Sequence, residues 1–340
     1  LITATSQTDS SITVTLKASS EVADKHWSAV SNPDGSSPFA NIEAPRVRVA
    51  SDGKNLYVMA ESQVTSKQNW RVCKHDGANW SQLGEPMTDL KNVDITWFNG
   101  VLYAIGTRAN NTGTVLKRLD GNNWSTVAST ESGFAYPDPK LGIVNDKLYA
   151  ALWSGSEVKV YEVAGSSLVQ YGVGLCLESP SCLSIADIAG KPAIVAGDMK
   201  SKAACTSIHQ LENNTWKEQL LVERHAASNV SFAKLGDRSF VYAYATYYDD
   251  NLTQDNVVHL AEFDSAGVQR SNTRIEQARS TAFSGNIVGG NNNLYLTFGT
   301  GNSGTLAYVL VNGSATQISQ VDGIVYAGNY GAESCVIGEK

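Results

Sequence analysis

Short apolar stretches with an aromatic residue near their start recur along the chain at a nearly constant distance. They read NLYVMAES from Asn55, VLYAIGT from Val101, KLYAALW from Lys147, KPAIVAG from Lys191, SFVYAYA from Ser239 and NLYLTFG from Asn293. Counted between Tyr57, Tyr103, Tyr149, Ile194, Tyr242 and Tyr295, the steps are 46, 46, 45, 48 and 53 residues. A fixed period of this size indicates an architecture that repeats one structural unit.

Each unit contains four strand-like stretches. An alternating stretch that ends in a tight turn, such as VDITWFNG or LGIVND, precedes the aromatic stretch, and two more alternating stretches follow it. The Asn-Gly and Asn-Asp pairs are typical of hairpin turns, because these residues tolerate positive φ. Four strands per unit without a helical period predict an all-β fold, a β-propeller with four-stranded antiparallel blades.

The predicted blades fill residues 1–340 as one domain. Six lie at about 45–86, 87–130, 131–173, 174–222, 223–272 and 273–320. The stretches SSITVTLKA and HWSAVSNP are left over at the N-terminus, and DGIVYAGNYG and SCVIG at the C-terminus. Because HWSAVSNP resembles the fourth-strand stretch NWSQLGEP, we expect a seventh, composite blade from residues 1–32 and 321–340, with six blades as the alternative.

The segments HDGANWS and LDGNNWS place Trp80 and Trp124 at the same position of two units. Later units carry Leu168, Trp216, Val268 and Ile318 there. Apolar character is kept while the indole is lost, which favours packing against a neighbouring blade over a repeated ligand site.

The recurring pattern of G-x-LYV or LYA followed by DGxNWS resembles the kelch-like propeller repeats of secreted and surface proteins. A double glycine typical of such repeats occurs once, at Gly289-Gly290. A more distant resemblance is to sialidase propellers, whose Asp-box has a similar turn. Asp76, Gly77 and Trp80 are spaced one residue shorter than that box, so they do not form it.

Composition and charge restrict the kinds of partner that the protein can bind. Only 17% of residues are charged, the net charge is −7 and the isoelectric point is about 5.3, which argues against a nucleic-acid partner because no basic stripe faces phosphate. No stretch has the roughly 18 apolar residues of a membrane span, so we expect no membrane insertion. The chain starts with Leu1, and we expect a mature secreted or cell-surface protein.

Cysteines and glycosylation motifs carry weaker signals. Cys176 and Cys182 flank a polar stretch, which leaves a small disulfide loop and two free thiols equally open. Asn-x-Ser/Thr motifs begin at Asn79, Asn110, Asn123, Asn213, Asn229, Asn251 and Asn312; they permit a glycoprotein without demonstrating one. The acidic stretch around Asp249 lacks the spacing of a calcium loop, and we expect neither a metal nor a cofactor.

Propeller ligands usually lie over the central channel, where all blades converge. The polar residues predicted at the start of the inner strands are Arg46, Asp94, Tyr136, Asp138, Lys140, Glu223, Arg224, His225 and Arg279. Further candidate ligand residues are aromatics predicted at strand ends or in loops: Trp97, Trp153, Tyr247 and Tyr248. Exposed aromatic faces stack on sugars or anchor protein partners.

Two functions fit this set. The first is a binding module, lectin-like or adhesin-like, that recognises a glycan or a protein receptor through loops on one face. The second is a sialidase-like glycoside hydrolase, in which Glu223-Arg224 and Arg279 complete an arginine cluster for a sugar carboxylate. Its candidate acid is Asp94, and its candidate nucleophile is Tyr326 or Tyr330. The Arg-Ile-Pro motif and true Asp-boxes of sialidases are absent, and arginines tied to carboxylates at blade junctions explain the same residues. The sequence therefore favours the binding module.

Overall fold

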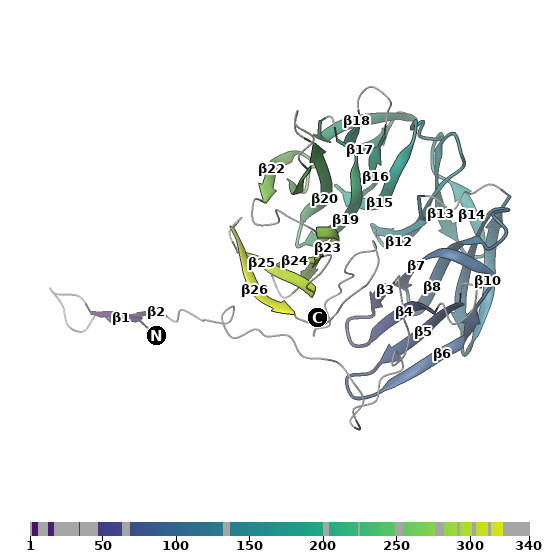
Figure 1. Ribbon diagram of the computed structural model, residues 1–340, viewed down its shortest axis with the longest axis horizontal. Helices are drawn as coiled ribbons and strands as arrows, with labels where there is room; N and C mark the ends of the chain where they lie inside the picture. The colour runs from purple at the N-terminus through teal and green to yellow at the C-terminus, as the bar shows by residue number, and fades with distance from the viewer. Residues whose placement is uncertain are drawn as a thin grey trace.

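The computed structural model describes residues 2–5, 13–16, 34, 47–62, 69–131, 137–199, 204–223, 225–248, 254–275, 282–290, 293–300, 304–311 and 314–321. Within them, six four-stranded antiparallel sheets follow one another along the chain. Figure 1 shows these sheets arranged in chain order around a common centre. The predicted propeller fold with four-stranded antiparallel blades is confirmed.

The strands of each blade follow the chain from the centre outward, so the first is innermost and the fourth outermost. The first three blades consist of β3 (Val47–Ser51), β4 (Leu56–Ser62), β5 (Asn69–His75) and β6 (Trp80–Met87), then β7 (Leu90–Phe98), β8 (Val101–Arg108), β9 (Thr114–Asp120) and β10 (Asn123–Thr130), then β11 (Lys140–Val144), β12 (Lys147–Trp153), β13 (Val158–Ala164) and β14 (Ser167–Gln170). Each begins and ends close to the predicted boundaries.

The next three blades have the same order. They consist of β15 (Pro180–Ile188), β16 (Lys191–Asp198), β17 (Cys205–Glu212) and β18 (Thr215–Val222), then β19 (Ala227–Leu235), β20 (Arg238–Tyr248), β21 (Gln254–Phe263) and β22 (Gln269–Ile275), then β23 (Ala282–Gly290), β24 (Asn293–Thr300), β25 (Gly304–Val311) and β26 (Ser314–Val321).

Residues with positive φ close the hairpins. Asn99 and Gly100 have φ of 47° and 80°, and Asn145 and Asp146 have φ of 47° and 55°. These values suit the two-residue turns whose twist matches that of paired strands. The Asn-Gly and Asn-Asp signals in the sequence therefore identified the turns correctly.

The core lies between neighbouring blades. Side chains alternate along each strand, so one set faces the preceding blade and the other the following blade. Trp70 and Leu90 are fully buried between the first and second blades, and Phe263 and Val241 between the fourth and fifth. Burying a large apolar side chain contributes about 1.5–3 kcal/mol, so these interfaces stabilise both the blades and their order.

Two of the repeated fourth-strand tryptophans, Trp124 and Trp216, pack against the preceding blade, in agreement with the predicted packing against a neighbouring blade. Gly84 of the first blade has a φ of 68°, and a Cβ placed there would lie 2.8 Å from Nε1 of Trp124. Trp216 donates a hydrogen bond from Nε1 to the carbonyl oxygen of Val173 in the third blade, at 2.8 Å. The DGxNWS motif is therefore a feature of blade packing.

The predicted seventh blade falls mostly outside the described residues. Of residues 1–32 and 321–340, the structure describes β1 (Ile2–Thr5), β2 (Thr13–Leu16) and Val321 at the end of β26. β1 pairs with β2 in antiparallel register, and within the described residues neither pairs with a blade strand. The composite blade stays a prediction.

Candidate functional site

The two ends of the blades differ in the length of their connections. Because neighbouring strands are antiparallel, the hairpins that join first to second and third to fourth strands share one end, which we call the turn face. The connections from second to third strands and from blade to blade share the other end, the loop face. Turn-face connections have two to five residues, whereas those at the loop face have up to nine, as in 131–139 and 171–179.

An ion-pair cluster joins the inner strands β3 and β7 to the connection that leads into β11. Arg48 on β3 donates a hydrogen bond from Nη2 to Oδ2 of Asp138, at 2.9 Å, and its Nε lies 3.8 Å from Oδ1 of Asp94 on β7. The side chains of Arg48, Asp94 and Asp138 are 13%, 14% and 18% exposed, respectively. We call these residues the Arg48 cluster.

Local backbone geometry places Asp94 in this cluster. β7 has an irregularity between Lys91 and Asp94 in its pairing with β8, and Asn92 there has a φ of 51°. A bulge of this kind redirects the side chains that follow it. Oδ2 of Asp94 accepts a hydrogen bond from the backbone N–H of Leu141 in the third blade, at 2.9 Å. One carboxylate therefore contacts both neighbouring blades.

Asp187 on β15 has the same role in the fourth blade. Its Oδ2 accepts hydrogen bonds from the backbone N–H of Asn145 in the third blade, at 3.4 Å, and from Nζ of Lys234 in the fifth, at 2.8 Å. Its backbone carbonyl accepts a further hydrogen bond from the hydroxyl of Ser239. Two inner-strand carboxylates thus fasten a blade to both of its neighbours, which is a structural use of Asp94.

The structure corrects two aromatic candidates. Trp97 stacks on Tyr57 of the first blade, with ring centroids 4.9 Å apart and planes at 13°. Trp153 is 8% exposed in the cluster of buried side chains between the third and fourth blades. Strand alternation turns both indoles towards a neighbouring blade, so the expectation that they form a ligand surface is wrong.

The connection before β19 is described in part. Glu223 is exposed, and His225 is partly exposed, with its Nδ1 3.2 Å from the carbonyl oxygen of Glu223. The backbone carbonyl of His225 accepts a hydrogen bond from Oγ1 of Thr206, at 3.1 Å. A hydroxyl of the fourth blade thus holds this part of the loop face.

Other sequence candidates fall outside what the structure describes. Arg46, Tyr136, Arg224, Arg279, Tyr326 and Tyr330 lie outside the described residues. Tyr247 and Tyr248 are described as backbone at the end of β20, where they pair with Asp255 and Gln254 of β21. The connections that contain Tyr136, Arg224 and Arg279 start and end at strand ends of the loop face.

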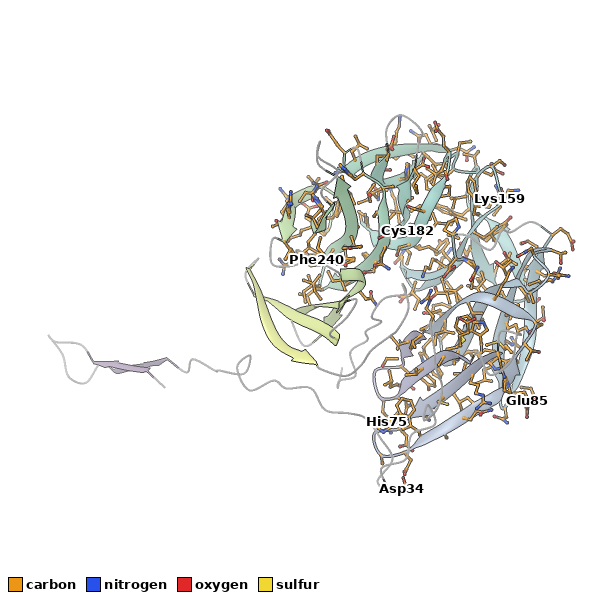
Figure 2. All side chains as sticks on the ribbon, viewed as in Figure 1. Asp34, His75, Glu85, Lys159, Cys182 and Phe240 are labelled. Atoms are coloured by element: carbon orange, nitrogen blue, oxygen red, sulfur yellow. The ribbon has the colours of Figure 1, made fainter. Side chains whose placement is uncertain are left out.

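The disulfide prediction is not realised, because Cys176 and Cys182 are both free thiols. Leu175 and Leu177 are buried, so Cys176 between them faces solvent. Cys182, labelled in Figure 2, lies on β15 and donates from Sγ to the carbonyl oxygen of Ala227 in the fifth blade, at 3.1 Å. Burial raises the pKa of the Cys182 thiol to about 11.

Arg48 is the site residue that sequence reasoning missed. It follows the predicted Arg46 by two positions in the sequence, which is the spacing of residues that share a side in an alternating strand. A search for cations two residues apart at the start of the first inner strand would have found it. Among the described residues, no group of three or more His, Cys, Asp or Glu side chains is arranged to hold a metal ion, and no helix has the length and hydropathy of a membrane span.

Comparison with known proteins identifies the fold but no sequence family. No family profile matches the chain, and no curated protein matches it by sequence. Among solved structures, a variant of the Aleuria aurantia lectin in complex with Fucα1-6GlcNAc is 12% identical, with a TM-score of 0.52, covering 82% of this chain and 95% of the lectin.

Two further solved structures are similar in fold. A variant of AofleA from Arthrobotrys oligospora is 9% identical, with a TM-score of 0.52 over 84% of this chain and 90% of that one. A prolyl endopeptidase is 15% identical, with a TM-score of 0.52, and the match covers 82% of this chain but 42% of the endopeptidase. These likenesses establish a β-propeller and leave the function to be argued from the residues.

Proposed function

We propose that this chain is a lectin-like binding module, secreted or at the cell surface, that recognises a glycan through the connections of its loop face. The observation that carries the proposal is the asymmetry between the two faces. Tight hairpins close the turn face, whereas the longer connections, and the residues that break the repeat, belong to the loop face. Rigid strands that present variable loops are a common basis for recognition.

The chemistry of these connections suits a polar, acidic ligand such as a carboxylate-bearing sugar. Arg46, Arg224 and Arg279 stand in or beside connections that lead into the inner strands β3, β19 and β23. A guanidinium group matches a carboxylate with two parallel hydrogen bonds. The similar fold of a lectin crystallised with a fucosylated disaccharide supports a carbohydrate over a protein receptor.

The glycosidase alternative loses its acid candidate to the blade junctions. Asp94 is engaged at Oδ1 by Arg48 and at Oδ2 by Leu141, and Asp138 is engaged by Arg48 as well. A catalytic acid needs a carboxyl group that reaches the substrate oxygen, and these carboxylates instead fasten one blade to the next. We therefore do not put forward an enzymatic function.

A glycan array probed with the labelled chain tests the proposal, followed by calorimetric titration of any sugar that binds. We expect binding to acidic glycans and a loss of affinity of at least tenfold in Arg224→Ala or Arg279→Ala. Arg118→Ala is the matched control, because Arg118 lies beside the turn-face hairpin of the second blade and pairs with Asp120. An empty array, binding that depends on Arg118, or hydrolysis of a fluorogenic sialoside would contradict the proposal.

A further inference from the structure

The ring of described blades is open at one place. Each inner strand packs against the inner strand of the next blade, in the order β3, β7, β11, β15, β19 and β23. Among these described strands, β23 and β3 make no comparable contact. Figure 1 shows the sixth sheet, β23 to β26, and the first sheet, β3 to β6, at the two ends of the series.

The first blade has an apolar face that no described blade covers. Its side towards the second blade carries Tyr57, Met59 and Trp70. The pairing register places another set on the opposite side, which we call the free face: Val47, Val49, Leu56, Val58, Ala60 and Cys73.

The free face is nevertheless largely dry. Val47, Ala60 and Cys73 are 9%, 1% and 2% exposed, yet they belong to none of the clusters of packed apolar side chains among the described residues. Burial raises the pKa of the Cys73 thiol to about 11. Nε of Arg71, which pairs in register with Ala60, is buried without a hydrogen-bond partner. An apolar surface with a buried donor calls for a covering element that supplies an acceptor.

The repeated tryptophan indicates what kind of element covers this face. Trp124 and Trp216 each pack against the blade that precedes their own. Trp80 has the same position in the first blade and pairs in register with His75, labelled in Figure 2, with ring centroids 4.9 Å apart. Cys73, two residues before His75 on β5, shares that side of the sheet. The sixth blade does not take this place, because β23 and β3 make no comparable contact among the described strands, so the blade that precedes the first would be a seventh.

We propose that segments from both ends of this chain, within residues 17–46 and 322–340, form a seventh blade that covers the free face and closes the ring; β1 and β2, which pair with each other, are not part of it. These two segments have 30 and 19 residues, together 49, which exceeds the length of one 46-residue repeat. Within the first segment, HWSAVSNP repeats the fourth-strand stretch NWSQLGEP, with Trp27 in the place of Trp80. A composite blade of this kind ties the first and last parts of the chain together, so the ring cannot open without separating its ends.

The alignment of HWSAVSNP with NWSQLGEP also predicts which residue contacts the free face. Val30 corresponds to Leu83, which packs partly buried against the second blade, the one that follows its own. For Val30 the following blade is the first, so its side chain belongs on the free face. Ser28 corresponds to the exposed Ser81 and is a matched control two residues away.

Native cysteines report on this closure in the full chain. We expect Cys73 to react with iodoacetamide at least 100-fold more slowly than the exposed Cys176, as resolved by peptide mass spectrometry. Val30→Asp should increase the alkylation rate of Cys73 at least tenfold. It should leave the rate of Cys205, which is 6% exposed on β17, unchanged. Ser28→Asp should change neither rate. Equal Cys73 rates in Val30→Asp and the unchanged chain would overturn the proposal.

Two measurements decide the matter if Val30→Asp fails to fold. Hydrogen exchange of the unchanged chain should protect amides in residues 26–33 and 322–338 by at least 100-fold over their unfolded rates, and unprotected amides there would refute the blade. Light scattering should give a monomer at concentrations at which Cys73 is protected. A dimer that exposes Cys73 on dilution would instead assign the free face to a second copy of the chain.

Discussion

Replacing Arg48 by methionine separates a structural use of the Arg48 cluster from a ligand-binding one. The substitution keeps an unbranched apolar stem but leaves the carboxylates of Asp94 and Asp138 without their shared cation. Removing one partner of a fully buried pair costs about 3–5 kcal/mol, whereas an exposed pair contributes about 0–1 kcal/mol. With side chains 13–18% exposed, we expect a loss of about 2 kcal/mol in the free energy of unfolding.

Differential scanning calorimetry and urea titration measure this loss. For a chain of 340 residues, 2 kcal/mol corresponds to a fall of about 3 °C in Tm. Lys147→Met is the control, because its ion pair with Glu162 has the same kind of contact, at 3.0 Å, but 54% and 30% exposure. We expect that variant to change the free energy of unfolding by less than about 0.5 kcal/mol.

The outcome that refutes this reasoning is equally specific. If Arg48→Met keeps its full stability and loses affinity for a glycan found on the array, Arg48 is a ligand residue. A double-mutant cycle with Asp138→Asn then shows whether the two side chains stabilise each other. We expect a coupling free energy of about 1 kcal/mol or more, since contacting residues in one network are not additive.

Three further substitutions test the blade packing and a turn. Gly84→Ala should lower the free energy of unfolding by about 2 kcal/mol in urea titration, because its φ of 68° is unfavourable for alanine and its Cβ would lie 2.8 Å from Trp124; an unchanged midpoint would contradict this packing. Trp216→Phe should lower the free energy of unfolding by about 1 kcal/mol in urea titration, since it removes the hydrogen bond to Val173; the same stability as the unchanged chain would show that this bond does not stabilise the junction. Burial would raise the pKa of Asp52, but hydrogen bonds from Asn55, Lys54 and Tyr57 lower it to about 2. The contribution of Asp52 to stability is therefore complete above about pH 4 and is lost as the pH falls towards 2. Asp52→Asn should flatten the acid limb of the curve of Tm against pH. An unchanged slope would contradict this role of the carboxylate.

The sequence predicted the blades well because their signals are local. Tight turns need residues that accept positive φ, and Asn99-Gly100 and Asn145-Asp146 stand where the hairpins turn. The period of about 46 residues then follows from four strands and their connections. The packing role of Trp124 was also predictable, because the position keeps apolar residues from unit to unit.

The candidate site was predicted less well because it depends on the direction of side chains between blades. Trp97 looked like a strand-end aromatic, yet it stacks on Tyr57 in the first blade. Cys176 and Cys182 looked like a disulfide loop, yet one faces solvent and the other bonds to Ala227. Neither contact has a signature in the neighbouring residues, since both partners come from other blades.

The inner-strand carboxylates explain why charged residues near the channel can be mistaken for catalytic residues in the sequence. Backbone N–H groups at the blade junctions need acceptors wherever no strand partner supplies one. Asp94 accepts from Leu141, and Asp187 accepts from Asn145. A short carboxylate on a central strand is well suited to bind the N–H of one neighbour and a cation of the other. The better candidates for recognition are then residues in the connections beyond the strand ends, and this is why Arg224 and Arg279, rather than Asp94, are the residues to substitute first.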